Sequence, residues 1–304
     1  MRQYGNEIQL YPGSDGKVRE VILAEHAGFC FGVQRAVDAV YDEIGRSGDI
    51  YTYGPVIHND IVVRDLEKRG VRIISSEDEI DAVNSGTVII RSHGVSRAIF
   101  EKLSNKPGIK LIDMTCPFVQ RIHRIVDSQS RSGKRIVIIG NVGHAEVVGH
   151  MGWSVSPVDV IETREEAEAF DAPPETPLCI VAQTTFHSKK FEEFVAILNN
   201  KGYNNFYVEN TVCNATGIRQ QEAALIASRV DVMIVIGGKN SSNSAKLFEI
   251  CKKECERTYF IQSLEELDLK LTPQDRSIGI TAGASTPKNI IEEVQRYVGT
   301  GTDI

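Results

Sequence analysis

From about residue 20 onward, short apolar runs alternate with longer segments in which apolar residues recur at helical spacing. The runs at 88–90, 136–139 and 232–236 have the length and composition of buried strands. Strands that alternate with helices are typical of βαβ units, which form parallel sheets. The pattern therefore predicts an α/β fold.

A longer repeat overlies this pattern, because the order strand, turn, cysteine, helix occurs three times. The three cysteines are Cys30, Cys116 and Cys213. The first two begin the same motif, Cys-x-x-Val-Gln-Arg, at 30–35 and 116–121. An internal repeat of this size indicates that the chain is built from similar structural units.

Polar residues recur with the cysteines. A polar side chain lies 28 residues after each cysteine, in the loop after a predicted strand; these side chains are His58, His144 and Ser241. A second strand end recurs in each repeat and carries His93, Thr184 and Ser285. In parallel sheets, ligands bind beyond the carboxyl ends of the strands. We therefore expect these side chains to line a binding pocket.

The expected architecture is three similar α/β lobes with small, mainly parallel sheets in a pseudo-threefold arrangement. We place the lobes at 32–115, 116–212 and 213–304, with residues 1–31 joining them. If the lobes face a common axis, the three thiols converge beside the pocket. Its expected lining is His58, His93, His144, Thr184, Ser241, Ser242, Asn243 and Ser285.

Composition narrows the class of protein. The chain has 304 residues and a formal charge of −7, which argues against nucleic-acid binding, since that needs a clustered basic excess. No apolar run is long enough to span a membrane, and the N-terminus lacks the pattern of a secretory signal. We therefore expect a cytoplasmic protein that binds neither nucleic acid nor membrane.

The six cysteines differ in context. Cys179 lies inside an apolar run, and Cys251 and Cys255 lie in a helical stretch without other metal-ligating residues, so we interpret all three as structural. The remaining histidines, His26, His123, His150 and His187, are interpreted as structural or surface residues.

Three thiolates favour a soft metal, either zinc with a fourth ligand or an iron–sulfur cluster with one iron open. The chain has no Cys-x-x-Cys, the usual knuckle of a structural zinc site, so the widely spaced ligands favour a cluster between lobes. Histidine, serine and asparagine at helix starts suit phosphate oxygens. Neither a P-loop nor a dinucleotide-binding Gly-x-Gly-x-x-Gly is present.

Nine motifs, in order over about residues 20–298, resemble those of the 4-hydroxy-3-methylbut-2-enyl diphosphate reductases, the LytB-type iron–sulfur reductase family. They include Gly-Phe-Cys30-Phe-Gly-Val, Asp-Met-Thr-Cys116-Pro, Gly-His144-Ala-Glu146 and Thr-Ala-Gly-Ala-Ser285. The others surround His58, His93, Thr184, Cys213 and Ser241. Residues 1–17 carry no matching motif.

The resemblance implies the last step of the methylerythritol phosphate route to isoprenoids, in which an allylic hydroxyl is removed reductively to give isopentenyl and dimethylallyl diphosphate. It implies one 4Fe–4S cluster with an open iron, held by Cys30, Cys116 and Cys213, and electrons from a ferredoxin or flavodoxin. The diphosphate-binding residues implied are His58, His93, His144, Ser241, Ser242, Asn243 and Ser285.

By the same resemblance, Glu146 is the proton donor, and Thr184 positions substrate and relays protons. Glu146 is also the only acidic residue in the post-strand loop motifs that carry these polar side chains. Because burial near phosphate disfavours a carboxylate, we expect the pKa of Glu146 to be raised.

Two alternatives remain. The first is a zinc hydrolase or deaminase, because His144-Ala-Glu146 imitates half of the zinc deaminase signature; the Pro-Cys-x-x-Cys half of that signature is missing. The second alternative is an iron–sulfur electron carrier or sensor without catalysis, although such a protein normally holds its cluster with four ligands and needs no polar pocket.

Overall fold

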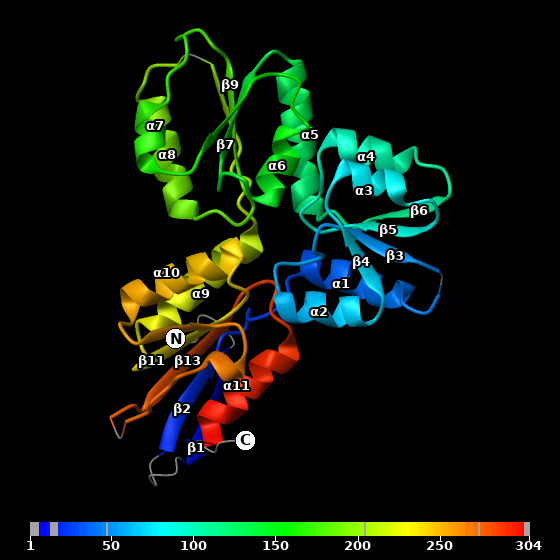
Figure 1. The fold of residues 1–304 in the computed structure, drawn as a ribbon. Coiled ribbons are helices and arrows are strands. Elements are labelled where there is room, and N and C mark those ends of the chain that lie inside the picture. Colours follow the sequence, from blue (N-terminus) through cyan, green and yellow to red (C-terminus); the bar gives the residue numbers. More distant parts are fainter. Residues whose placement is uncertain (1–5, 13–17, 47, 204, 273, 301–304) are drawn as a thin grey trace. The chain divides into compact units, whose positions relative to one another are not determined.

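The computed structural model describes residues 6–12, 18–46, 48–203, 205–272 and 274–300 (Figure 1). It divides into two compact units. Unit 1 comprises the described residues of 1–33, 58–63 and 214–304, and unit 2 comprises those of 34–57 and 64–213. No helix among these residues is both long enough and apolar enough to cross a bilayer.

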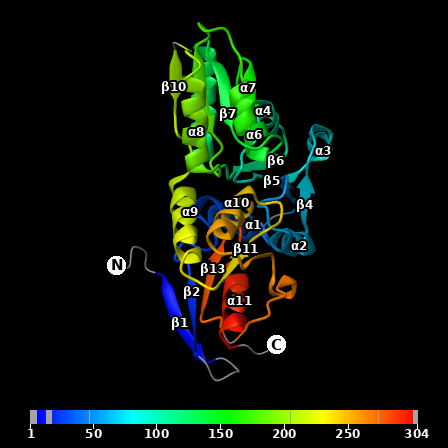
Figure 2. The same cartoon turned by 90° about the vertical axis from the view of Figure 1, so that its left-hand side faces the viewer.

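Unit 1 is built on a five-stranded sheet of order β1-β2-β13-β11-β12, in which only β1 is antiparallel to its neighbour. Figure 2 shows β1 at the edge of this sheet. The strands are β1 (Glu7–Pro12), β2 (Val18–Leu23), β11 (Val232–Ile236), β12 (Thr258–Ile261) and β13 (Ser277–Ala282). The helices are α9 (Asn214–Ala227), α10 (Ser242–Glu254), α11 (Lys288–Thr300) and the short 3₁₀ helix η1 (Leu264–Glu266).

Helices cover both faces of this sheet. Ile234 and Ile236 of β11 pack in the cluster that includes α11, whereas Met233 and Val235 pack in the cluster formed with α9 and α10. Successive strand residues point to opposite faces, so a continuous apolar run buries both sides of a strand. This arrangement explains why β11 contains no polar position.

Unit 2 contains two four-stranded sheets, both entirely parallel. The first has the order β4-β3-β5-β6 and comprises β3 (Ile50–Tyr53), β4 (Val71–Ile74), β5 (Gly86–Ile90) and β6 (Ile109–Asp113). Its helices are α1 (Phe31–Glu43), α2 (Asp60–Lys68), α3 (Glu77–Ala82) and α4 (Arg97–Ser104), of which α1 and α2 begin in unit 1.

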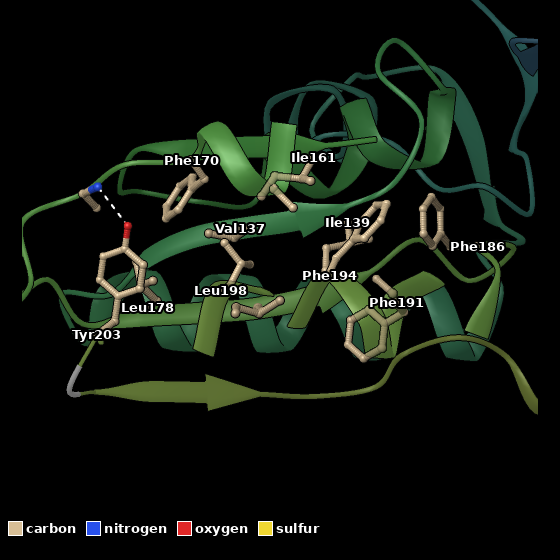
Figure 3. Close-up of a cluster of buried hydrophobic side chains, with 14 residues drawn as sticks. Val137, Ile139, Ile161, Phe170, Leu178, Phe186, Phe191, Phe194, Leu198 and Tyr203 are labelled. Carbon is tan, nitrogen blue, oxygen red and sulfur yellow. Dashed lines mark hydrogen bonds between the residues drawn. The ribbon is translucent and has the colours of Figure 1, made fainter. Parts of the chain in front are cut away.

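The second sheet of unit 2 has the order β10-β9-β7-β8. It comprises β7 (Arg135–Ile139), β8 (Val158–Ile161), β9 (Leu178–Ala182) and β10 (Phe206–Val208). Its helices are α5 (Pro117–Arg131), α6 (Ala145–Met151), α7 (Arg164–Ala169) and α8 (Ser188–Asn199). On the face toward α7 and α8, Phe191, Phe194 and Leu198 pack on Val137 and Ile139, and Ala172 N–H donates to the Tyr203 hydroxyl (3.1 Å; Figure 3).

The predicted α/β fold with three small, mainly parallel sheets is confirmed. Residues from both ends of the chain build the sheet of unit 1, since β2 pairs with β13 in the register Val21 to Ile278. The expected joining segment 1–31 therefore supplies two strands of a sheet, and its residues 1–5 and 13–17 lie outside the described residues. The lobe boundaries stay a prediction.

Because α8 packs on the second sheet of unit 2, we expect that shortening one of its buried side chains lowers the stability of the protein strongly. Replacing Leu198, which is 0% exposed, by alanine should lower the free energy of unfolding by ~2–5 kcal/mol, because a cavity replaces a buried side chain. Leu10, which is 70% exposed on β1, is the matched control, and its replacement should cost at most ~0.5 kcal/mol. Urea titrations followed by circular dichroism measure both, and equal losses would contradict this account of the core.

Candidate active site

The three repeated cysteines share one backbone position. Each immediately precedes a helix, namely α1, α5 or α9. Each backbone N–H donates to the carbonyl two residues beyond the end of a parallel strand: Cys30 to Ala284 (3.3 Å), Cys116 to Ser92 (3.0 Å) and Cys213 to Thr184 (2.9 Å). The repeat in the sequence is therefore a repeat in hydrogen bonding, and it fixes each cysteine at the carboxyl edge of a sheet.

The other three cysteines lie in the core. Cys179, Cys251 and Cys255 are buried, whereas Cys30, Cys116 and Cys213 are partly exposed. Burial raises the pKa of Cys179 to about 12 and, with a contribution from Cys255, that of Cys251 to about 12, so the thiols of Cys179 and Cys251 stay neutral. Their predicted structural role is confirmed.

An arginine after each cysteine contacts the loop that carries another cysteine. Arg35 donates to the carbonyls of Asp113 (3.4 Å) and Thr115 (3.3 Å), just before Cys116. Arg121 forms an ion pair with Glu209, four residues before Cys213. The motif Cys-x-x-Val-Gln-Arg thus has a structural purpose that the sequence alone did not disclose.

The third arginine contacts the loop of the first cysteine. Arg219, buried on α9 after Cys213, donates to the carbonyls of His26 and Gly28, each at 2.8 Å, just before Cys30. On the same helix, the buried carboxylate of Glu222 accepts the N–H groups of Glu25 (2.8 Å) and His26 (3.1 Å). Two charged side chains of α9 therefore hold the loop of Cys30.

Three of the predicted polar loops meet within unit 1. The Ser285 hydroxyl donates to the carbonyl of His58 (3.2 Å). A Cβ atom on Gly238 would lie 2.3 Å from the same carbonyl oxygen, so the loop after β11 approaches His58 as closely as glycine permits. Ser241 caps α10 by accepting the N–H of Ser244. The structure thus brings His58, Ser241 and Ser285 together.

Asn243, in the first turn of α10, is the most unusual of these residues. It is 4% exposed, and both its amide nitrogen and its amide oxygen are buried with no hydrogen-bond partner in the described part of the chain. Buried polar atoms are normally paired, so a side chain of this kind points to a polar ligand. Ser242 accepts a hydrogen bond from Lys246 (2.8 Å), a cation one turn along α10 that the sequence analysis missed.

In unit 2, His144 caps α6, because its Nδ1 accepts the N–H of Glu146 (3.2 Å). The rings of His93 and His144 lie edge to face, with centroids 5.7 Å apart. The two predicted histidines of this unit are therefore neighbours, and the cap holds the ring of His144.

Glu146 is 2% exposed, and polar groups contact both of its carboxylate oxygens. Its Oε1 accepts the N–H of Thr184 (2.6 Å) and lies 3.2 Å from Nε2 of His150. Its Oε2 accepts the Thr184 hydroxyl (2.8 Å). The structure therefore joins the two predicted catalytic side chains directly.

The expected rise in the pKa of Glu146 is wrong for this structure. Burial does raise the pKa, but the hydrogen bond and positive charge of His150, the N–H of Thr184 and the charge of His144 outweigh it. Together they lower the pKa from 4.5 to about 2. Burial and phosphate charge alone predict a raised pKa, and the contact with His150, four residues along the same helix, reverses the direction.

The position of Thr184 also differs from expectation. The carbonyl of Thr184 accepts the N–H of Cys213, just as the carbonyls of Ser92 and Ala284 accept those of Cys116 and Cys30. The residues that follow these three carbonyls are therefore equivalent in the repeat, so Thr185 rather than Thr184 matches His93 and Ser285. Thr185 accepts a hydrogen bond from Gln183 (2.9 Å). The side chain of Thr184 instead points to Glu146, an arrangement that a count of residues could not predict.

The chain matches the model of the family described as LytB protein over residues 21–299. A 4-hydroxy-3-methylbut-2-enyl diphosphate reductase from Caldanaerobacter subterraneus subsp. tengcongensis is 44% identical over 277 residues, which are 90% of this chain and 95% of that protein. The protein of the same name from Clostridioides difficile is 39% identical over 91% of this chain and 98% of its own length.

Solved structures agree with this match. The E-1-hydroxy-2-methyl-but-2-enyl-4-diphosphate reductase from Plasmodium falciparum superposes with a TM-score of 0.83 at 29% identity, over 91% of this chain and 86% of that one. A structure of (E)-4-hydroxy-3-methyl-but-2-enyl diphosphate reductase, described as the terminal enzyme of the non-mevalonate pathway, gives 0.66 at 40% identity over 91% and 98%. By sequence and by fold, this chain belongs to the LytB protein family.

Proposed function

We propose that this protein reduces 4-hydroxy-3-methylbut-2-enyl diphosphate to isopentenyl and dimethylallyl diphosphate, the last step of the methylerythritol phosphate route. The observation that carries the proposal is the near-complete match to reductases of this name, with 90% of this chain and 95% of one relative aligned. The buried pair of Glu146 and Thr184 supports it, because the reaction needs a positioned acid.

The proposed cofactor is one 4Fe–4S cluster, with Cys30, Cys116 and Cys213 as ligands and one iron open to substrate. The donor set fits, because three partly exposed thiols stand at helix starts on braced loops, whereas the other cysteines are buried. Helix N-termini favour the thiolate anions that such a cluster requires. When bound, the cluster supplies electrons one at a time and a Lewis-acidic iron.

The proposed diphosphate site combines His58, His93, His144, Ser241, Ser242, Asn243 and Ser285. Asn243 supports it most directly, since its amide is buried without a partner in the described residues and can both donate to and accept from a polar ligand. The first turn of α10 adds backbone N–H groups and positive helix-dipole potential. Lys246 beside Ser242 adds positive charge.

The reaction consumes two electrons and two protons. The carbon–oxygen bond breaks, the hydroxyl leaves as water after taking one proton, and an end of the allyl group takes the other proton. The negative charge of a bound diphosphate would oppose the ionised form of Glu146 and so favour its protonation. Protonated Glu146 would then give the first proton through the Thr184 hydroxyl, which is hydrogen-bonded to its Oε2. Protonation of the allyl group at either end accounts for two products from one site. We propose a ferredoxin or flavodoxin as electron donor.

Anaerobic purification followed by an ultraviolet–visible spectrum tests this function against its rivals. A brown protein that reduces the allylic diphosphate supports the proposal. A colourless zinc protein would favour the deaminase-like alternative, and a brown protein that neither binds nor reduces the diphosphate would favour an electron carrier or sensor.

Serine in place of Cys30, Cys116 or Cys213 should impair cluster retention and abolish turnover, because serine is a poor ligand for a soft metal. Iron and sulfide content, measured with the visible spectrum, would detect the loss. The matched controls are Cys179→Ala, Cys251→Ala and Cys255→Ala, which should keep the cluster. Loss of the cluster in Cys251→Ala but not in Cys213→Ser would overturn the assignment.

Glu146→Gln should retain the cluster and bind the diphosphate, while turnover falls by ~10²–10⁴, the usual contribution of a positioned acid. Steady-state rates with an artificial one-electron donor, compared at equal cluster content, measure the effect. Glu165→Gln, on the exposed face of α7, serves as control. Near-normal turnover in Glu146→Gln would remove this carboxyl from the mechanism.

The arginine after Cys213 should matter for the cluster although it is not a ligand. Arg219→Met removes two hydrogen bonds to the loop before Cys30. Because hydrogen bonds to charged groups contribute about 1.5–3 kcal/mol each, cluster loss to a chelator should accelerate about tenfold or more. Arg121→Met, which breaks an exposed ion pair, should change this rate far less. Equal rates in both variants would contradict a specific role of Arg219.

A further inference from the structure

The helix that follows Cys116 presents a row of arginines to solvent. Through Ile122 and Val126, α5 packs on the face of the second sheet opposite α7 and α8 (Figure 1). On its outer side, residues spaced three or four apart form one line along the helix. We call this line the α5 stripe; its members, all exposed, are Pro117, Arg121, Arg124, Ser128 and Arg131.

The internal repeat shows that the fold does not require these cations. The helices α1, α5 and α9 are equivalent, since each begins directly after one of the three repeated cysteines. At the position of Arg124, α1 has Asp38 and α9 has Gln221, and both are exposed. One turn further along, α1 has a second exposed acid, Asp42. The basic stripe is therefore a property of α5 and not of the repeat.

Acidic neighbours neutralise only part of the α5 stripe. Arg121 forms an ion pair with Glu209, and Arg131 shares Asp127 with a further arginine. Arg124 has neither an ion pair nor a hydrogen bond within the described ranges of the chain. The stripe and its acidic neighbours together are thus net positive, on a chain whose formal charge is −7.

Apolar groups adjoin the stripe. The second residue of α5, Phe118, is 44% exposed. Beside Arg124 lies a cavity of about 220 Å³ within unit 2, whose mainly apolar lining includes Val95, Phe100 and Trp153. Arginine and aromatic residues are enriched at protein interfaces, and a hollow among them can receive an anchoring side chain of a partner. This face of unit 2 therefore combines the usual components of a protein-binding surface.

We propose that the α5 stripe is the docking surface for the electron donor, and that this donor is an acidic one-electron carrier protein. The inference rests on the proposed reductase function. Because α5 begins directly after Cys116, a proposed cluster ligand, a carrier on the stripe is bound beside the group that it must reduce. The cavity beside Arg124 receives an apolar side chain of the carrier.

The charge of the rest of the chain makes this surface selective. An acidic carrier is repelled by a protein of net negative charge and is attracted by its basic stripe, which steers the encounter toward one orientation. At 1.5 Å per helical residue, the stripe is about 21 Å long from Pro117 to Arg131. A surface of this length suits the small interface of a transient redox complex.

One electron passes in each encounter. The reduced carrier loses one electron and leaves in its oxidised form, so two encounters supply the two electrons that one turnover consumes. No bond between the carrier and this chain forms or breaks. Because the oxidised carrier must leave before the next one arrives, the weak attraction of exposed charges suits the task.

The kinetic test uses the cluster-loaded enzyme with two acidic carriers, a reduced ferredoxin and a reduced flavodoxin. Arg124→Glu should raise the KM for the carrier about three- to tenfold, because a repulsive charge replaces an attractive one. Arg124→Gln should raise it less, and added salt should shrink both differences. With dithionite, a small donor that needs no docking surface, both variants should turn over at the wild-type rate.

The matched control is Gln221→Glu, which adds a negative charge at the equivalent exposed position of α9. Its KM for the carrier should stay within twofold of the wild-type value. A rise equal to that of Arg124→Glu would show that the overall charge of the chain governs docking, which would overturn the assignment to α5.

Binding can be measured without turnover. The chain has one tryptophan, Trp153, so labelling with 5-fluorotryptophan gives one fluorine NMR signal from the lining of the cavity. Oxidised flavodoxin, which transfers no electron, should shift this signal saturably. In Arg124→Glu, half of the shift should require about three- to tenfold more flavodoxin, in agreement with the kinetic effect.

Three results would overturn the inference. The first is an unchanged KM for both carriers in Arg124→Glu. The second is a fluorine signal that stays in place at saturating flavodoxin. The third is a wild-type enzyme that reduces the diphosphate with dithionite but with neither carrier. Failure of the wild-type enzyme to reduce the diphosphate with dithionite would instead refute the proposed function.

Discussion

One hydrogen bond, made three times, is the constraint on which the arrangement of the site depends. A cysteine N–H at the start of a helix donates to the carbonyl two residues beyond a parallel strand, as Cys116 does to Ser92. The bond joins two loops of one sheet edge, one carrying a thiol and the other a polar side chain. It therefore fixes thiol and polar residue together wherever the repeat occurs.

Charged side chains reinforce this backbone bond to different degrees. Buried Arg219 and Glu222 hold the loop of Cys30 from one side, whereas Arg121 reaches the segment before Cys213 through an exposed ion pair. A buried hydrogen-bonded charge is costly to leave unpaired, and an exposed pair contributes little. The three cysteine positions are thus alike in geometry but unequal in how firmly they are held.

The sequence was sufficient to predict the features that repeat along the chain. Apolar runs such as 232–236 identified buried parallel strands, because both faces of these strands are covered. Cys30, Cys116 and Cys213 were separable from the buried cysteines by context alone. The same spacing placed His58 and Ser241 in loops that follow strands, as the structure has them.

The sequence was insufficient where contacts depend on three-dimensional packing. His123 and His150 look like unremarkable helix residues, and only the packing of α5 against α6 brings their rings together. The pKa of Glu146 was expected to rise because burial was considered without His150, which lies four residues along the same helix and lowers that pKa. Thr184 was assigned the place in the repeat that Thr185 occupies, because a count of residues does not show that the N–H of Cys213 donates to the carbonyl of Thr184.

The central claim is that this chain reduces an allylic diphosphate, and turnover measures it most directly. Anaerobically purified wild-type protein should be given 4-hydroxy-3-methylbut-2-enyl diphosphate and an artificial one-electron donor, and the products should be separated and identified. The account predicts isopentenyl and dimethylallyl diphosphate together, with two electrons consumed per molecule formed. Recovery of unchanged substrate by a protein that carries its full iron and sulfide would contradict it.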